Sequence, residues 1–145
     1  MLTYARAGAI IKKDGSYLFM KRIKKGLQKD HVFYAIIGGR PDEGETPQET
    51  AIREVLEESG LKITLNPNFS FVCDAGLKSG YYTAPEYFFW ADSIQGTPKL
   101  GGQEFQFNSP NNSYELTWIH EKDLASIKLL PSSVHTYLVK LTENI

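Results

Sequence analysis

One segment near the middle of the chain carries the signals for both ends of a helix. Thr46 and Glu49 stand three residues apart, as in a capping box, and Pro47 occupies the first helical position. Gly60 ends the run, and glycine is the residue that most easily adopts the left-handed conformation just past a helix. The sequence therefore predicts a helix over residues 47–59, around which the rest of the fold must be arranged.

The predicted helix has an apolar arc and an acidic arc. With steps of 100° per residue, the apolar arc contains Ala51, Ile52, Val55 and Leu56. The opposite arc contains Glu54, Glu57 and Glu58. Carboxylates three and four residues apart repel one another, and a single Arg53 cannot neutralise three of them. Carboxylate oxygens suit Mg²⁺ or Mn²⁺, so the acidic arc is a candidate metal site. The alternative is a solvated acidic helix face.

The spacing around this helix resembles a known motif. The fixed residues, in order, are Gly39, Glu45, Arg53, Glu54, Glu57, Glu58 and Gly60, with Val55 and Leu61 at two apolar positions. This pattern is similar to the complete Nudix box, G-x5-E-x7-R-E-U-x-E-E-x-G-U, where U is apolar. A chance match in a chain of this length has a probability on the order of one in ten million. By this resemblance the chain is identified as a member of the Nudix hydrolases.

The resemblance implies a metal-dependent reaction. Nudix hydrolases use water and a divalent metal to cleave a phosphoanhydride bond of a nucleoside diphosphate linked to another group. Carried onto this chain, Glu54, Glu57 and Glu58 would be the carboxylates that bind Mg²⁺ or Mn²⁺, with Glu57 as the central ligand, and Glu54 and Glu57 would be catalytic. The backbone carbonyl of Gly38 would be a further ligand.

The resemblance also implies supporting roles around these carboxylates. Arg53 would pair with Glu45 and orient the catalytic glutamates without touching substrate. Gly39 and Gly60 would shape the backbone.

The chemistry is consistent with these residue types. A diphosphate repels an incoming water, and metal ions on its oxygens lower this barrier and acidify the water. A carboxylate near the metals can accept the proton, and the candidates outside the helix are Glu86, Glu104 and Glu115. We favour Glu104, because it lies in the long segment 96–112, which has the length to fold over the site. The alternative is that Glu104 is only a polar loop residue.

Two arginines are candidates for substrate binding. Arg6 lies on the first predicted strand beside small residues and could reach a phosphate or a ribose, although a surface ion pair is an equal alternative. Arg22 lies at a strand end within the basic stretch 21–25 and could hold a polyphosphate. The alternative for this stretch is a solvated basic loop.

The flanking sequence predicts a strand-rich α/β fold. Asp14-Gly15 between apolar runs predicts a hairpin over residues 7–22. Further predicted strands cover 32–37, 61–65, 69–74, 81–90 and 114–119, and two short helices cover 121–126 and 131–141. With the Nudix resemblance, the expected architecture is a mixed β-sheet sandwiched between α-helices.

Length and charge exclude several classes of protein. At 145 residues the chain has the size of one domain, so a single Nudix domain over 1–145 is expected. The net charge of −1 gives no field that would attract nucleic acid, and no apolar stretch reaches the roughly 20 residues that span a bilayer. With a single cysteine and no signal peptide, a cytoplasmic protein is expected.

The expected partner is therefore a small nucleotide-type substrate rather than a membrane or a nucleic acid. A homodimer is possible, because dimers are common among similar proteins. The alternative function is a non-catalytic nucleotide-binding or regulatory module of the same fold.

Overall fold

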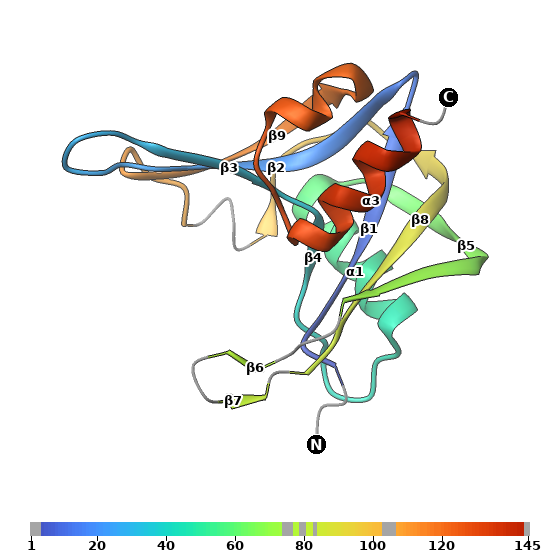
Figure 1. The fold of residues 1–145 in the computed structure, drawn as a ribbon. Coiled ribbons are helices and arrows are strands. Elements are labelled where there is room, and N and C mark those ends of the chain that lie inside the picture. The colour runs from blue at the N-terminus through green and yellow to red at the C-terminus, as the bar shows by residue number, and fades with distance from the viewer. Residues whose placement is uncertain (1–3, 74–76, 79–80, 83, 103–106, 144–145) are drawn as a thin grey trace.

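A mixed sheet of eight strands forms the centre of the computed structural model, which describes residues 4–73, 77–78, 81–82, 84–102 and 107–143 (Figure 1). The main strand order is β10-β3-β2-β1-β8-β5, with β4 paired to β1 and β9 paired to β2. The strands are β1 (Arg6–Lys13), β2 (Ser16–Lys24), β3 (His31–Ala35), β4 (Ile37–Gly39), β5 (Lys62–Cys73), β8 (Glu86–Gln95), β9 (Asn112–His120) and β10 (Leu129–Leu130). Two short strands, β6 (Leu77–Lys78) and β7 (Tyr81–Tyr82), form a second small sheet.

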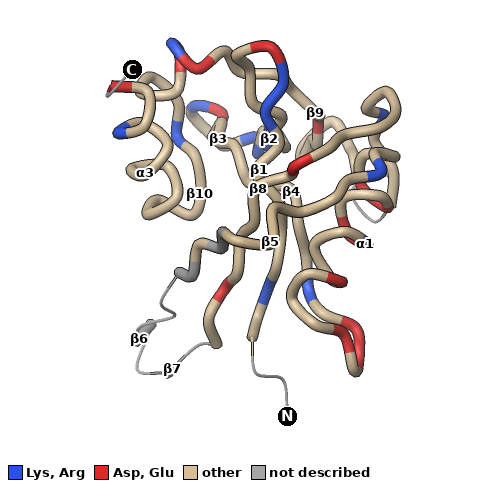
Figure 2. The backbone as a smooth tube through the Cα atoms, turned by 90° about the vertical axis from the view of Figure 1, so that its right-hand side faces the viewer, with Lys and Arg blue, Asp and Glu red and all other residues tan. Residues whose placement is uncertain are grey.

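Helices cover both faces of the main sheet. The helix α1 (Pro47–Ser59) packs on β1, β4 and β5, and α3 (Ser132–Glu143) packs on β10 and β5. A 3-10 helix, η1 (Glu121–Ser126), contacts α3. Figures 1 and 2 show α1 and α3 on opposite sides of the sheet. The prediction of an α/β fold with a mixed sheet between helices is confirmed.

Signals carried by a few neighbouring residues gave correct predictions. Asp14 and Gly15 have φ angles of 52° and 80° and join β1 to β2 in the predicted hairpin. The capping box of Thr46 and Glu49 is formed at the start of α1, and Gly60 ends the helix with φ 74°. These turns and caps depend on local backbone conformation, which the residue types determine directly.

Several strand boundaries differ from the prediction. The expected strand over 32–37 is divided, because β3 pairs with β2 whereas β4 pairs with β1. Conversely, the two strands expected over 61–65 and 69–74 are one strand, β5, whose pairing with β8 shifts register between Leu65 and Ser70. The expected strand over 81–90 is also divided, into β7 and β8. Partner strands distant in sequence decide these boundaries.

The strand β1 lies at the middle of the core. Ile10 belongs to the apolar cluster that includes side chains of α3, whereas Ala9 and Ile11 belong to the cluster that includes Val55 of α1. All three are fully buried, because alternate residues of β1 face opposite covered sides of the sheet.

Within the described ranges, no helix is both long and apolar enough to cross a membrane.

Candidate active site

A cavity of about 630 Å³ opens beside α1 and β4, and the predicted metal-binding residues line it together. Its lining comprises Arg6, Gly38, Gly39, Arg40, Pro41, Asp42, Arg53, Glu54, Glu57, Glu58 and Gly102. Residues from β1, β4, α1 and two connecting segments thus meet at one place. The structure therefore brings Arg6 and Gly38 to the three glutamates of the helix.

The side of α1 that packs on the sheet is rotated from the predicted one, although Ala51 and Val55 are fully buried as expected. Ile52 and Leu56, expected in the packed arc, are 39% and 43% exposed, whereas Glu58 is buried at 4% exposure. The buried side consists of Thr50, Ala51, Val55, Glu58 and Ser59. The prediction of three carboxylates on an outward face is therefore wrong for Glu58. The helix is turned so that part of its acidic arc lies against the glycine-rich strand β4.

Glycine at position 39 is what allows this approach. A Cβ atom built on Gly39 would lie 2.4 Å from the carboxyl carbon of Glu54, well inside contact distance. The neighbouring Gly38 is restricted for another reason, since its Cβ would lie 2.4 Å from the carbonyl oxygen of Ala7 on the paired strand β1. The glycine pair thus lets β4 approach both the Glu54 carboxylate and β1.

We expect Gly39→Ala to lower kcat about tenfold with little loss of stability. The clashing atoms are the end of the flexible Glu54 side chain, which can move away, but the carboxylate then leaves its place in the cavity. The control is Gly44→Ala. Gly44 has φ 81° and no neighbour within 4 Å, so the variant should lower the free energy of unfolding by about 1 kcal/mol and retain activity. Thermal melting and initial rates measure both. A Gly39→Ala enzyme with unchanged kcat would contradict the role given to Glu54.

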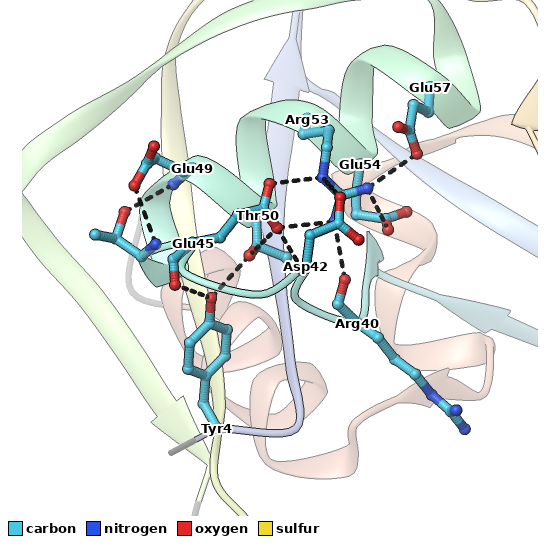
Figure 3. Close-up of polar contacts among 10 residues, drawn as sticks. Tyr4, Arg40, Asp42, Glu45, Glu49, Thr50, Arg53, Glu54 and Glu57 are labelled. Carbon is cyan, nitrogen blue, oxygen red and sulfur yellow. Dashed lines mark hydrogen bonds and ion pairs between the residues drawn. The ribbon is translucent and has the colours of Figure 1, made fainter. Parts of the chain in front are cut away.

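The Arg53 guanidinium holds the carboxylates of the site in place (Figure 3). Its Nε donates to Glu45 Oε2 at 2.7 Å, and Nη2 donates to Glu45 Oε1 at 2.9 Å and to the carbonyl oxygen of Arg40 at 2.9 Å. Its Nη1 donates to Glu54 Oε1 and to Glu57 Oε2, each at 3.0 Å. These contacts use all five N–H groups of the guanidinium. Arg53 therefore fixes both glutamates relative to Glu45.

Glu45 is itself held by several donors. Its Oε1 accepts from the backbone N–H of Asp42 at 2.7 Å and from the hydroxyl of Thr50 at 2.9 Å, in addition to Arg53. Hydrogen bonds from Arg53 above all, with those from Asp42 and Thr50, lower the pKa of Glu45 to about 2, against a smaller opposing effect of burial. The hydrogen bonds from Arg53 to Glu45, and then those to Glu54, raise the pKa of Arg53 against the opposing effect of burial. Both groups are therefore charged at neutral pH.

The lowered pKa of Glu45 predicts how stability depends on pH. The folded protein binds this proton more weakly than the unfolded chain, so the contribution is complete above pH 4.5 and is lost as the pH falls toward 2. Because both side chains are partly solvated, we expect this contribution to the free energy of unfolding to be on the order of 2 kcal/mol. Urea unfolding of the wild type and of Glu45→Gln at pH 6 and pH 3 measures the contribution. The stability difference should shrink at pH 3, and a difference independent of pH would contradict this assignment.

The oxygen donors of the cavity fit a hard divalent cation in their chemistry. Glu54, Glu57, Glu58 and Gly38 all line the same cavity, and carboxylate and carbonyl oxygens are the donors that Mg²⁺ and Mn²⁺ prefer. Within the described ranges, no group of three His, Cys, Asp or Glu side chains is arranged to hold a metal ion as it stands. Arg53 contacts one oxygen of Glu57, and the Glu57 side chain is 51% exposed, so it has room to turn toward an ion.

The segment after β8 is fastened to the end of α1. The backbone N–H groups of Lys99 and Gly101 donate to the last carbonyls of the helix, on Ser59 and Glu58, at 2.8 and 2.9 Å. This places Gly102 in the lining of the cavity. Glu104, the predicted general base, lies outside the described residues, so its role stays a prediction.

A second cavity of about 660 Å³ shares Arg6 and Glu58 with the first. It contains Arg22, which lies directly across from Phe33 on β3 and from Tyr114 on β9 in the strand register. The centre of the Arg22 guanidinium is 3.7 Å from the centroid of the Tyr114 ring, and its Nη2 donates to Asn112 at 2.8 Å. Arg6 donates to the carbonyl oxygen of Ile36 at 3.2 Å. Both predicted substrate-binding arginines therefore lie on one continuous surface with the glutamates.

Sequence reasoning missed several residues that support the site. Arg40 binds Arg53 and Asp42 binds Glu45 through backbone groups, which leave no signature in residue type, and the Asp42 carboxylate also lies 3.2 Å from Arg53 Nε. Tyr4 and Thr50 bind Glu45 through hydroxyls. The one available signal was that Thr50 lies three residues before Arg53 and so shares a face of the helix with it. Whether the Thr50 side chain points toward Glu45 depends on the rotation of α1, which the sequence did not predict.

Comparison with known proteins identifies the same family as the sequence motif that forms this site. A family model described as the NUDIX domain matches residues 1–137. A protein of Methanocaldococcus jannaschii named as an ADP-ribose pyrophosphatase is 31% identical over 127 residues, which cover 78% of this chain and 66% of that protein. An uncharacterized Nudix hydrolase of Bacillus subtilis, YvcI, is 24% identical over 92% of this chain and 78% of its own length.

Solved structures show the same fold. A MutT NUDIX hydrolase of Burkholderia pseudomallei superposes with a TM-score of 0.67 at 20% identity, covering 96% of this chain and 99% of that one. An Ap4A hydrolase of C. elegans superposes with a TM-score of 0.65 at 17% identity, covering 97% and 96% of the two chains.

Proposed function

Because the chain belongs to the Nudix hydrolase family, we propose that it hydrolyses a phosphoanhydride bond of a nucleoside diphosphate-linked compound with Mg²⁺ or Mn²⁺. The observation that carries this proposal is the single cavity in which Glu54, Glu57 and Glu58 meet Arg6. The products would be a nucleoside monophosphate and either pyrophosphate or a phosphorylated leaving group. We also propose that residues 1–145 form one Nudix domain, since α3 packs on the same sheet as α1.

In this proposal the three glutamates and the Gly38 carbonyl would hold the metal. When bound, the metal would neutralise diphosphate charge and acidify the attacking water. Arg53 contacts one oxygen of each of Glu54 and Glu57, so it limits how far these two carboxylates move when the metal binds.

We propose Glu104 as the general base that accepts a proton from the attacking water. The support for this proposal is that Gly102, two residues before Glu104 in sequence, lines the cavity, and that the backbone N–H of Gly101 donates to the end of α1. Of the other two candidates, Glu86 lines the second cavity, whereas Glu115 lines neither described cavity.

The second cavity would take the group joined to the diphosphate. Arg6 borders both cavities, which supports its proposed contact with a phosphate of the substrate. The ring of Phe33 and the Arg22–Tyr114 pair offer flat surfaces on which a planar group can stack. ADP-ribose is the first substrate to test, because a relative at 31% identity is named as an ADP-ribose pyrophosphatase.

The experiment is a substrate panel. ADP-ribose, nucleoside triphosphates, nucleotide sugars and dinucleoside polyphosphates are each incubated with Mg²⁺, with Mn²⁺ and with a chelator. The nucleotide products are then separated and quantified by anion-exchange chromatography. We expect metal-dependent turnover of one class. If no compound is hydrolysed but a nucleotide still raises the melting temperature, the chain is a binding module and the proposal is wrong.

A further inference from the structure

Two hydroxyl groups connect the segment before β1 to Glu45, the partner of Arg53 (Figure 3). The Tyr4 side chain is buried at 4% exposure, and its hydroxyl lies 2.8 Å from Thr50 Oγ1 and 2.9 Å from the backbone carbonyl oxygen of Glu45. Thr50 is fully buried, and its hydroxyl lies 2.9 Å from Glu45 Oε1. The contacts form a continuous chain from Tyr4 through Thr50 to Glu45.

The direction of this chain follows from counting hydrogens. Tyr4 and Thr50 supply two hydroxyl hydrogens for three contacts. Glu45, with its pKa near 2, is ionised and can only accept, so Thr50 donates its hydrogen to Glu45. The single hydroxyl hydrogen of Tyr4 is then shared between two acceptors, Thr50 Oγ1 and the backbone carbonyl oxygen of Glu45. Each donor in such a chain polarises the next, which strengthens the bond to the carboxylate.

The far end of the chain is Arg53. Glu45 receives two hydrogen bonds from the Arg53 guanidinium, whose remaining donors bind the Arg40 carbonyl, Glu54 and Glu57. If Glu45 turns, the guanidinium must turn with it, and the two glutamates lose their fixed contact. The position of Glu54 and Glu57 therefore depends on what holds Glu45.

We propose that Tyr4 and Thr50 are positioning residues for hydrolysis, holding Glu45 so that Arg53 presents Glu54 and Glu57 in the reactive arrangement. The proposal rests on the proposed function. Neither hydroxyl lines the cavity, so they act on the reaction only through Glu45. The Tyr4 ring packs edge-on against Tyr87 at 5.9 Å between centroids, and phenylalanine would keep that contact. The hydroxyl can thus be removed without emptying the core.

The first test is Tyr4→Phe, with Tyr87→Phe as its matched control. The Tyr87 hydroxyl makes no hydrogen bond within the described part of the chain, so its removal deletes the same atom from the neighbouring ring. On the substrate of the panel that the wild type hydrolyses fastest, we expect Tyr4→Phe to lower kcat about tenfold with unchanged KM. Tyr87→Phe should match the wild type. A kcat for Tyr4→Phe within twofold of wild type would overturn the proposal.

Two further comparisons separate positioning from a purely structural role. Thr50→Val should lower kcat as Tyr4→Phe does, and Thr50→Ser, which keeps the hydroxyl, should restore it. In a Glu45→Gln background, Tyr4→Phe should cause no further loss, because the contact it supports is already altered. The same tenfold loss in both backgrounds would show that Tyr4 acts by another route and would overturn the proposal.

A readout without turnover distinguishes this proposal from the proposed function. NMR measures how fast the Arg53 Nε hydrogen exchanges with solvent, and the resonance is assigned by its absence in Arg53→Lys. We expect this exchange rate to increase in Tyr4→Phe and to stay constant in Tyr87→Phe. If the wild type hydrolyses nothing in the panel, the proposed function fails, and this exchange rate still decides whether Tyr4 holds Arg53. An unchanged exchange rate would overturn the positioning role.

Discussion

Glu57→Gln is expected to lower kcat about 100- to 1,000-fold. The substitution keeps the size of the side chain but removes a charge from the cavity in which Glu54, Glu57 and Glu58 meet. Loss of several kcal/mol of charge stabilisation in the transition state corresponds to a rate decrease of this size. Initial rates over a range of Mn²⁺ concentrations provide the measurement, and the concentration giving half-maximal rate should rise as well.

The control for this variant is Glu49→Gln on the same helix. Glu49 accepts from the backbone N–H of Thr46 in the capping box, a role that glutamine also fills, and it does not line the cavity. Glu49→Gln should therefore retain both wild-type activity and the wild-type melting temperature. If Glu57→Gln were as active as this control, the reaction would have to occur elsewhere on the protein.

Glu57 also shows how far the sequence reaches. Its spacing from Glu54 and Glu58 predicted a shared metal site, and the structure places all three on one cavity. The start and end of α1 were predictable because Thr46 and Gly60 determine the backbone conformation and hydrogen bonds of the residues next to them. The rotation of α1 was not predictable, because it depends on Gly39, a residue of another element that has no Cβ atom to block the Glu54 carboxylate. Hydrophobic periodicity alone would have buried Ile52 instead of Glu58.

The contacts that hold the glutamates were out of reach for a similar reason. Tyr4 lies 41 residues from Glu45 in sequence, and their contact exists only because β1 is placed beside α1 by the sheet. No periodicity of one element encodes a bond of this kind. The Nudix motif indicated that Arg53 and Glu45 act together, but it gave no account of which groups hold Glu45.

Arg53→Lys is the second large effect, an expected decrease in kcat of about 100-fold although the positive charge is kept. Lysine has three donors on one atom, whereas Arg53 uses five N–H groups on three atoms to bind Glu45, Glu54, Glu57 and the Arg40 carbonyl. An ammonium group cannot span these partners. If Glu54 and Glu57 act as proposed, their displacement by about 1 Å is sufficient for a loss of this size.

The division of this effect between kcat and KM tests the role of Arg53 directly. Because every N–H of its guanidinium is bonded within the protein, none remains for substrate, and KM should stay near the wild-type value. Steady-state kinetics of Arg53→Lys, of Glu45→Gln and of the double variant provide the measurement. The losses in kcat should be far from additive, since either change breaks the same paired contact. A raised KM with normal kcat would instead place Arg53 on the substrate and contradict its positioning role.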